Sequence, residues 1–503
     1  MIFFASKQKL LDHFNLGMML NYLLIVLFGC LSCNDSDTDL LDRSIDPEEP
    51  EDRVDTVDRA PGALPNIILF VADDLGWTDL GVQGSDFYES PTIDQLAEDG
   101  IRFTNAYANA SNCAPTRASL ISGLYGPRHG VYTVNSSARG KSVNRKLIPT
   151  PNTKVLDPKF FTLPEALKEA GYMNCMAGKW HLSDDPRPYG FDVNYGGYHK
   201  GSPNSYFSPY NNPALSDGPD GEHLPDRLAK DVSNWIEDHK DTSFFIYMPF
   251  YSVHTPIQAR TDLTNKYAGK ADGVYHDHDR YAAMIEAMDQ AIARVLSKVE
   301  ELGLSENTMI IFTSDNGQFG PVSSSRPLRG SKGMYYEGGI RVPMFIKWPG
   351  KIQPGIVSDE PVISLDIYPT LMSIVSNQVP AGLDGQSLLP VLDGGMLSPR
   401  SLFWHFPAYL DMKSNDRAFD DAHAPPHWRA TPCSVIRDGD WKLIEYFETG
   451  ELELFNLADD IGEKVNLSET ETGTRDALYS KLVQWREDTN APVPTELNPD
   501  FKE

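Results

Sequence analysis

Two pairs of oxygen-bearing side chains lie far apart in the chain, at Asp73-Asp74 and at Asp315-Asn316. Each pair directly follows a run of apolar residues. Carboxylate and amide oxygens are hard ligands that suit Ca²⁺ or Mg²⁺, whereas zinc prefers histidine and cysteine. We favour Ca²⁺, which tolerates irregular, carboxylate-rich coordination. Either pair alone could simply cap a helix, so the prediction of a metal site requires the two pairs to meet.

A single cysteine, Cys113, precedes residues 118–123, which have the pattern of a helix start. A position near a helix N-terminus exposes a side chain to the positive end of the helix dipole and to free N–H groups, which favours anionic chemistry. A thiolate nucleophile is one interpretation of a cysteine at this position. The sequence offers no Cys-His-Asn pattern of a thiol hydrolase in its support.

Short apolar runs alternate with helical patterns between these positions. Continuous apolar runs predict strands covered on both faces, at 66–71, 172–177, 244–250, 309–313 and 342–348. Helical patterns occupy 93–98, 163–170, 226–238 and 281–302. This alternation predicts an α/β fold with a mostly parallel sheet.

The carboxyl ends of parallel strands share one edge of a sheet, and ligands gather there. Lys179 and His181 follow the second apolar run, and His254 follows the third. With the two oxygen-bearing pairs, four strand ends therefore deliver ionisable groups to one rim. We expect the functional site at this rim.

The chain changes character after about Gly385. Short strands with turns between them are predicted at 401–406, 434–437, 441–446 and 453–456, with a hairpin turn at 437–440 and a final helix at 474–488. This pattern predicts a smaller antiparallel α+β domain. We accordingly expect a larger domain over 64–384 and a C-terminal domain over 385–503.

Residues 1–33 have the composition of an export signal. Lys7 and Lys9 precede an apolar run at 18–28, which is shorter than the roughly 20 residues that a membrane-spanning helix needs. Either Cys33, which we favour, or Cys30 resembles the lipidated cysteine of a bacterial lipoprotein.

A plain secretory signal with incidental cysteines is the alternative. The acidic segment 34–63 lacks apolar periodicity and predicts a disordered tether. We therefore expect an exported protein that a lipid anchor holds to a bacterial membrane.

Acidic residues greatly outnumber basic ones, 71 to 44, which gives a net charge of −27. Such a surface repels phosphate backbones and argues against a nucleic-acid partner. An anionic substrate would require basic side chains concentrated in its site. Of the other cysteines, Cys175 and Cys433 are predicted to be buried free thiols.

The motif Cys113-x-Pro115-x-Arg117, with Ser119 and Gly123 after it, resembles the signature of the sulfatase family. In that signature the cysteine is oxidised to Cα-formylglycine (3-oxoalanine). The resemblance extends over nearly the whole mature chain, through 65–76, 178–182, 253–256, 313–317, 329–333, 337–343, 365–370, 440–443 and 453–457. Thr116 stands where serine is common and keeps the hydroxyl.

The resemblance implies an alkaline-phosphatase-like α/β sandwich with a small C-terminal α+β domain. It also implies a formylglycine-generating maturation enzyme as a partner, and Ca²⁺ held by Asp73, Asp74, residue 113, Asp315 and Asn316. The catalytic residues that it implies are Cys113 as formylglycine nucleophile, Arg117, Lys179 and Lys332 on the sulfate, His181 on the second hydroxyl, and His254 with Lys332 on the leaving oxygen.

Three further segments carry weaker predictions. Residues 195–212, with His199 and Lys200, resemble a substrate-facing loop. His405 and His427-Trp428 could bring the C-terminal domain to the pocket rim, with buried packing as the alternative. The run 276–278, His-Asp-His, is predicted to be a solvated loop rather than a metal site.

The expected substrate is a sulfated oligo- or polysaccharide, such as ulvan, carrageenan or another galactan, or a host glycosaminoglycan. The expected reaction is hydrolysis of its O-sulfate esters. A phosphodiesterase or phosphonate hydrolase of the same superfamily is the enzymatic alternative. A non-catalytic polysaccharide-binding lipoprotein is a third hypothesis, against which the full set of catalytic residues counts.

Overall fold

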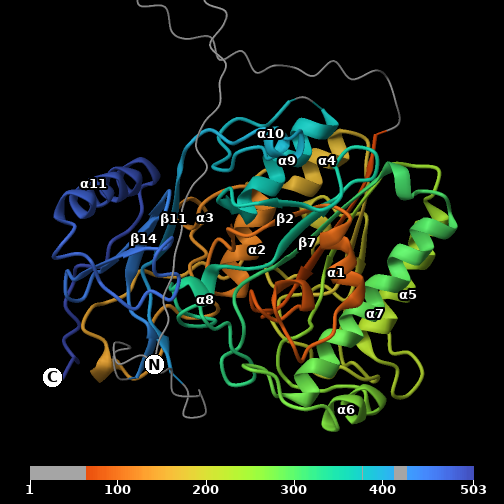
Figure 1. Ribbon diagram of the computed structural model, residues 1–503, viewed down its shortest axis with the longest axis horizontal. Coiled ribbons are helices and arrows are strands. Elements are labelled where there is room, and N and C mark those ends of the chain that lie inside the picture. Colours follow the sequence, from red (N-terminus) through yellow and green to blue (C-terminus); the bar gives the residue numbers. More distant parts are fainter. Residues whose placement is uncertain (1–63, 377, 413–426, 503) are drawn as a thin grey trace, which may run out of the picture. The chain divides into compact units, whose positions relative to one another are not determined.

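A sheet of eight strands forms the centre of the computed structural model, which describes residues 64–376, 378–412 and 427–502 (Figure 1). The order is β5-β4-β6-β1-β7-β8-β2-β9. Their bounds are β1 Asn66–Ala72, β2 Ile101–Phe103, β4 Met173–Ala177, β5 Val193–Tyr195, β6 Phe244–Pro249, β7 Thr308–Ser314, β8 Met344–Lys347 and β9 Ile356–Ser358. Only β8 runs antiparallel to its neighbours within this sheet, so the predicted mostly parallel sheet is confirmed.

Helices cover both faces of this sheet (Figure 1). Alternate residues of a strand point to opposite faces, and in β1 they enter different cores. Ile68 and Phe70 pack with α1 (Pro91–Glu98), α5 (Leu224–Asp238) and α7 (Asp279–Glu301). Ile67 and Leu69 pack with α2 (Cys113–Ser122), α4 (Leu163–Glu169) and α9 (Ile367–Val375). Burial on both faces explains why the strands read as continuous apolar runs.

The C-terminal part contains the predicted antiparallel sheet, in the order β11-β14-β15-β16. These strands are Ser401–Phe406, Cys433–Asp438, Trp441–Tyr446 and Leu452–Asn456, and α11 (Thr472–Thr489) packs against β14 and β15. Asp438 pairs with Trp441, which confirms the predicted hairpin turn. The residues just beyond 385, from Leu388 to Leu397, still pack in the core of the larger part.

A buried ionic cluster joins the C-terminal sheet to the segment before β8. Lys442 of β15, fully buried, lies 2.9 Å from Glu337 and 2.8 Å from Glu463. Glu337 begins α8 (Glu337–Ile340) and also accepts a hydrogen bond of 2.7 Å from Tyr107. Burial raises the pKa of Glu463, and the neighbouring Glu337 carboxylate adds to that rise. Burial also acts to raise the pKa of Glu337, but the charges of Lys442 and Arg341 outweigh it and lower the value.

The predicted export signal, Cys30, Cys33 and the acidic tether all lie outside the described residues. Within the described ranges, no helix is both long and apolar enough to cross a membrane.

Candidate active site

Four neighbouring strands, β4, β6, β1 and β7, end at the same edge of the sheet. Val71 pairs with Pro249 and Ala72 with Ser314, so the three inner strands end level with one another. The edge carries the residues predicted from the sequence: Asp73 and Asp74 after β1, Lys179 and His181 after β4, His254 after β6, and Asp315 and Asn316 after β7. The prediction that these strand ends meet at one rim is confirmed.

Opposite charges lie in direct contact at this rim. Lys179 Nζ is 2.6 Å from Asp73 Oδ2, and both side chains are fully buried. Lys332 Nζ is 2.6 Å from Asp74 Oδ1 and 3.4 Å from Cys113 Sγ. A third cation, Arg117, lies 2.7 Å from Asp315 Oδ2.

Cys113 is the first residue of α2 and is 1% exposed. The hydroxyl of Thr116 holds the turn before the helix, since it donates to the Ala110 carbonyl and accepts from the Ala110 N–H. Burial raises the pKa of the Cys113 thiol to about 12, although Lys179 and Lys332 oppose the rise. A thiol with that pKa is protonated at neutral pH, so the residue is not a thiolate nucleophile as it stands.

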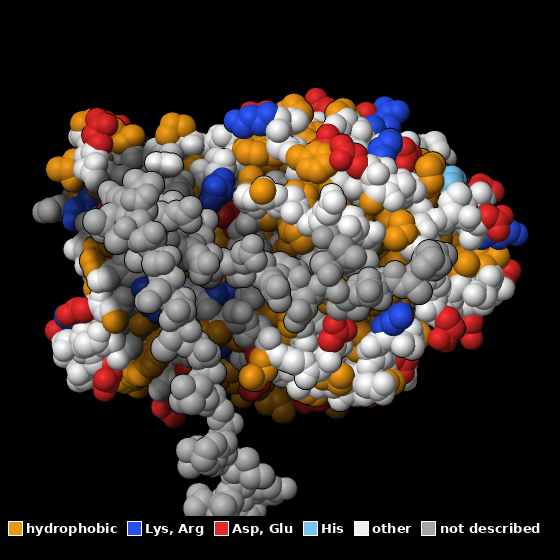
Figure 2. Space-filling model, turned by 90° about the horizontal axis from the view of Figure 1, so that it is seen from above, with side chains coloured by type: hydrophobic (Ala, Val, Ile, Leu, Met, Phe, Trp, Pro, Cys, Tyr) orange, Lys and Arg blue, Asp and Glu red, His pale blue; other side chains and the backbone are white. Residues whose placement is uncertain are grey.

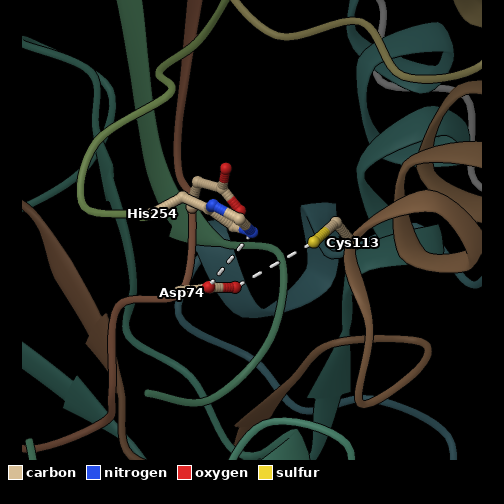
Figure 3. A group of neighbouring side chains, drawn as sticks. Asp74, Cys113 and His254 are labelled. Carbon is tan, nitrogen blue, oxygen red and sulfur yellow. Dashed lines mark hydrogen bonds and ion pairs between the residues drawn. The ribbon is translucent and has the colours of Figure 1, made fainter. Parts of the chain in front are cut away.

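The oxygen-bearing residues fit a hard cation. Asp73 Oδ1 and Asn316 Oδ1 are buried and have no hydrogen-bond partner, a costly condition for a polar atom unless an ion or water satisfies it. Ligand atoms of Asp73, Asp74, Cys113 and His254 all lie within 4.8 Å of one another. Figure 3 shows Asp74 between Cys113 and His254, with its carboxylate facing both side chains.

The two carboxyl groups after β1 have opposite electrostatic environments. Burial raises the pKa of Asp73 well above its usual range, and the charges of Asp315 and Asp74 add to the rise. Burial acts in the same direction on Asp74, but the charges of Lys332 and Lys179 outweigh it and lower the pKa. Negative charge therefore concentrates on Asp74, next to Cys113.

Both histidines at the rim are neutral at physiological pH. Burial lowers the pKa of His254 to about 3, and Lys332 adds to the effect. Burial and the charges of Lys179 and Arg117 lower the pKa of His181 well below its ordinary value. His181 has a left-handed backbone with φ of 64°, and its buried Nδ1 has no hydrogen-bond partner. A neutral ring with an open nitrogen is suited to accept a proton.

A cavity of about 410 Å³ opens over Cys113. Asp74, His181, His254 and Lys332 line its floor, and the loop residues His199, Lys200, Gly201 and Ser202 line one side. The structure thus places His199 and Lys200 at the cavity, as predicted. Gly201 packs closely against the His181 ring, since a Cβ added at Gly201 would lie 2.2 Å from the imidazole Cε1.

His405 does not face this cavity, and its assignment as a substrate-binding residue is wrong. The side chain is buried in the C-terminal part, with Nδ1 2.8 Å from Ser434 Oγ and Nε2 3.0 Å from the Pro492 carbonyl oxygen. Among the cavity-lining residues that the structure describes, the C-terminal part instead supplies Leu410, Asp411 and Arg429.

His276 is buried as well, so the prediction of a solvated loop is wrong at this residue. Its Nδ1 lies 3.0 Å from Ser85 Oγ, its Nε2 lies 2.9 Å from the Ser324 carbonyl oxygen, and its ring stacks on Tyr88. His278 caps α7 by accepting from the Tyr281 N–H. Both histidines have structural partners.

Sequence reasoning missed several residues that line the cavity, among them Asn135, Arg139, Phe319, Asp411 and Arg429. None belongs to a motif with recognisable spacing. Basic residues are outnumbered by acidic ones in this chain, 44 to 71. The scarcity of basic residues was therefore the one signal that could have marked Arg139 and Arg429 as candidate site residues. On the face shown in Figure 2, basic and acidic side chains are interspersed, with no broad basic patch.

Because the chain has a net charge of −27, an anionic substrate requires basic side chains concentrated in its site, and the buried cations provide them. Arg117 and Lys179 are 1% and 0% exposed, and the Lys332 side chain is 12% exposed. Positive charge that an anionic substrate would need is therefore concentrated at the rim, where low solvent access strengthens its effect.

Comparisons with known proteins agree on one family. The family model described as "Sulfatase" matches residues 65–377, and the model described as "N-sulphoglucosamine sulphohydrolase, C-terminal" matches residues 331–488. A "Sulfatase" of Formosa agariphila is 36% identical, with 85% of this chain and 90% of the relative covered. The "N-acetylgalactosamine-6-sulfatase" of Mus musculus is 32% identical, with 68% of each covered.

A solved structure shares the fold over most of its length. It is described as "Crystal structure of Ps i-CgsB in complex with k-i-k-neocarrahexaose", and it aligns with a TM-score of 0.72 at 26% identity. The alignment covers 88% of this chain and 95% of that protein.

Proposed function

Because this chain belongs to the sulfatase family and is a sulfuric ester hydrolase, we propose that it desulfates a sulfated carbohydrate by means of a Cα-formylglycine made from Cys113 and a bound Ca²⁺ ion. The observation that carries the proposal is the position of Cys113. It lies at the start of α2, within contact distance of Lys332 and Asp74, at the floor of a cavity.

The residues that would hold Ca²⁺ are Asp73, Asp74, Asp315 and Asn316, with an oxygen of residue 113. The unpartnered oxygens of Asp73 and Asn316 support this assignment, as does the hard, all-oxygen donor set. When bound, the ion supplies positive charge that lowers the pKa of a hydroxyl and neutralises charge in the transition state.

Cys113 Sγ marks where the oxygens of the hydrated formylglycine would lie. One hydroxyl of residue 113 would pass its proton to Asp315 and attack sulfur, and the bond between sulfur and the alcohol oxygen would break. Lys179, Arg117 and Lys332 stabilise the sulfate oxygens, since preorganised cations at a buried site favour the more negative transition state. His254 and Lys332 line the cavity where the leaving oxygen needs a proton.

The second hydroxyl of residue 113 completes the cycle. His181 takes its proton, the carbon–oxygen bond to sulfate breaks, and the aldehyde is restored. The neutral state and open nitrogen of His181 support this role. An unmodified serine or cysteine has no second hydroxyl and could not expel the sulfate.

Comparing turnover of a sulfate monoester with that of a phosphodiester and a phosphonate monoester tests the reaction. We expect kcat/KM to be highest for the sulfate ester, because its three terminal oxygens match the three cations, whereas a phosphodiester and a phosphonate monoester each offer two. A strong preference for the phosphodiester would overturn the proposal in favour of the superfamily alternative.

The proposed substrate is a sulfated oligosaccharide of galactan, carrageenan or ulvan type. The neocarrahexaose named with the aligned structure and the galactosamine named with the mouse relative support a sulfated galactose unit. We further propose export to a bacterial surface through a lipid on Cys33, or Cys30, and maturation by a formylglycine-generating enzyme.

Gly201 provides a test of how the proposed catalytic residue His181 is positioned. Gly201→Ala places a Cβ 2.2 Å from the imidazole, so the ring or the loop must move. We expect kcat to fall by about tenfold to hundredfold, since a misplacement of 1 Å can cost a factor of that size. Steady-state kinetics of sulfate release will measure the change in kcat.

Gly269→Ala is the matched control, because an added Cβ there meets no atom within 4 Å and the backbone φ is not positive. Both variants should unfold at the wild-type temperature. Equal kcat in the two variants would exclude the positioning role of Gly201.

A further inference from the structure

The outer wall of the cavity carries more positive charge than the scissile sulfate requires. Beyond the rim residues, its charged side chains are Arg139, Lys200 and Arg429, with Asp411 as the acid. His199 also lines the wall, and its Nδ1 lies 2.5 Å from Asp184. In a chain whose acids exceed its bases by 27, a net basic wall is a departure from composition that points to an anionic ligand.

Arg139 and Asp411 form a solvent-accessible ion pair at the wall. Arg139 Nε lies 3.1 Å from Asp411 Oδ1, and the two side chains are 27% and 32% exposed. An ion pair this exposed is weak. The guanidinium retains further N–H donors beyond Nε, which can bind a second oxyanion.

Lys200 extends from the loop that covers His181. Its Nζ donates to Asn204 Oδ1 at 2.7 Å. The partner is a neutral amide, so this bond orients the ammonium without neutralising its charge.

Arg429 comes from β13 (Trp428–Ala430), which pairs with β12 (Leu410–Asp411). The aliphatic part of the Arg429 side chain packs against Gly333. A Cβ added at Gly333 would lie 3.2 Å from Arg429 Cδ and 2.4 Å from Leu410 Cδ2. Gly333 directly follows Lys332. The paired strands therefore bring a cation of the C-terminal part to the residue that follows the proposed catalytic lysine, with its guanidinium 5.7 Å from the Phe319 ring.

We propose that Arg139, Lys200 and Arg429 form a second anion subsite, which binds a further sulfate or a carboxylate carried by the same saccharide. The inference rests on the proposed function and deepens it, because it makes the preferred substrate at least doubly anionic. The scissile sulfate is already served by the buried Arg117, Lys179 and Lys332. The Arg139 side chain at the wall is 27% exposed, against 12% for Lys332 at the rim, and the cavity of about 410 Å³ is large enough for more than one sulfate group.

Three disaccharides distinguish the source of the second charge. The first carries one sulfate, the second carries an additional sulfate on the neighbouring sugar, and the third carries a carboxylate in place of that sulfate. Sulfate release by the full-length protein gives kcat/KM for each. We expect the wild type to prefer the two dianionic disaccharides by about tenfold or more, because a hydrogen bond to a charged group strengthens binding by at least that factor.

Arg429→Gln and Lys200→Gln should each lower kcat/KM for the dianionic disaccharides by about tenfold more than for the monosulfated one. Their dependence on ionic strength should also be weaker than that of the wild type. Arg475→Gln, on α11, removes the same charge away from the cavity and should change none of these values. Arg429→Lys should recover part of the loss.

Equal kcat/KM of the wild type for all three disaccharides would overturn the subsite and leave the sulfatase proposal intact. The same conclusion would follow if the variants lost activity equally on all three. Failure to release sulfate from any of them would overturn the proposed function, and the subsite with it. Preference for only one dianionic disaccharide would support the subsite and identify its anion.

Discussion

Replacement of Cys113 by alanine is expected to abolish sulfate release and to leave the fold intact. Cys113 is small and buried, and its sulfur contacts Lys332 and Asp74 at the cavity floor. Under the proposed mechanism, residue 113 supplies both the attacking and the expelling hydroxyl, so its loss removes the chemistry and not merely a binding contact. Sulfate release and thermal unfolding, measured on the same preparation, will separate the two effects.

Cys175→Ala is the matched control, since Cys175 is also a buried free thiol but lies within β4. This variant should keep wild-type turnover. Cys113→Ser gives a sharper result, because an unmodified serine can accept sulfate but has no second hydroxyl to expel it. We expect one turnover and a protein heavier by one sulfonate group, measured by intact mass. Unchanged activity of Cys113→Ala would refute the mechanism, whereas a wild type that releases no sulfate would support the non-catalytic hypothesis.

Substitution of Lys442 by methionine should destabilise the protein by about 3–5 kcal/mol, the usual cost of removing one partner from a buried ionic group. Lys442 is fully buried between Glu337 and Glu463. Without the ammonium, two fully buried carboxyl groups lose their shared partner in a site that cannot hydrate them. Denaturant unfolding followed by tryptophan fluorescence will measure the loss, which we expect to include separation of the C-terminal sheet from α8.

Lys481→Met is the control for Lys442→Met. Lys481 also pairs with an acid of the C-terminal part, Asp438, but its side chain is 56% exposed. Exposed ion pairs contribute only about 0–1 kcal/mol. A loss for Lys442→Met no greater than for Lys481→Met would show that the buried cluster does not stabilise the junction.

The central sheet was predictable because its strands are covered on both faces, which makes them continuous apolar runs. The rim followed from the same reasoning, since parallel strands place their carboxyl ends together. The predicted start of α2, at residue 118, was less accurate. The helix begins at Cys113 and includes Pro115, which the first turn tolerates because its N–H groups have no partner within the helix.

The outer wall of the cavity could not be read from the sequence. Arg429 lies on β13, which pairs with β12, and Arg139 is held there by an ion pair with Asp411 of β12, a residue distant in the chain. The predictions for His405 and His276 are wrong for a related reason, because the role of a histidine depends on the groups that bind its ring. A hydroxyl and a carbonyl oxygen bind each ring, and neither partner leaves a local signal.

The burial of Cys113 also sets an order of events in biosynthesis. A side chain that is 1% exposed, under a fully buried helix and beside four strand ends, is out of reach of any other protein. The oxidation that we propose must therefore precede folding, while residues 113–117 are still extended. Chains that fold before oxidation would remain folded and inactive. The relative rates of maturation and folding would therefore set the fraction of active molecules.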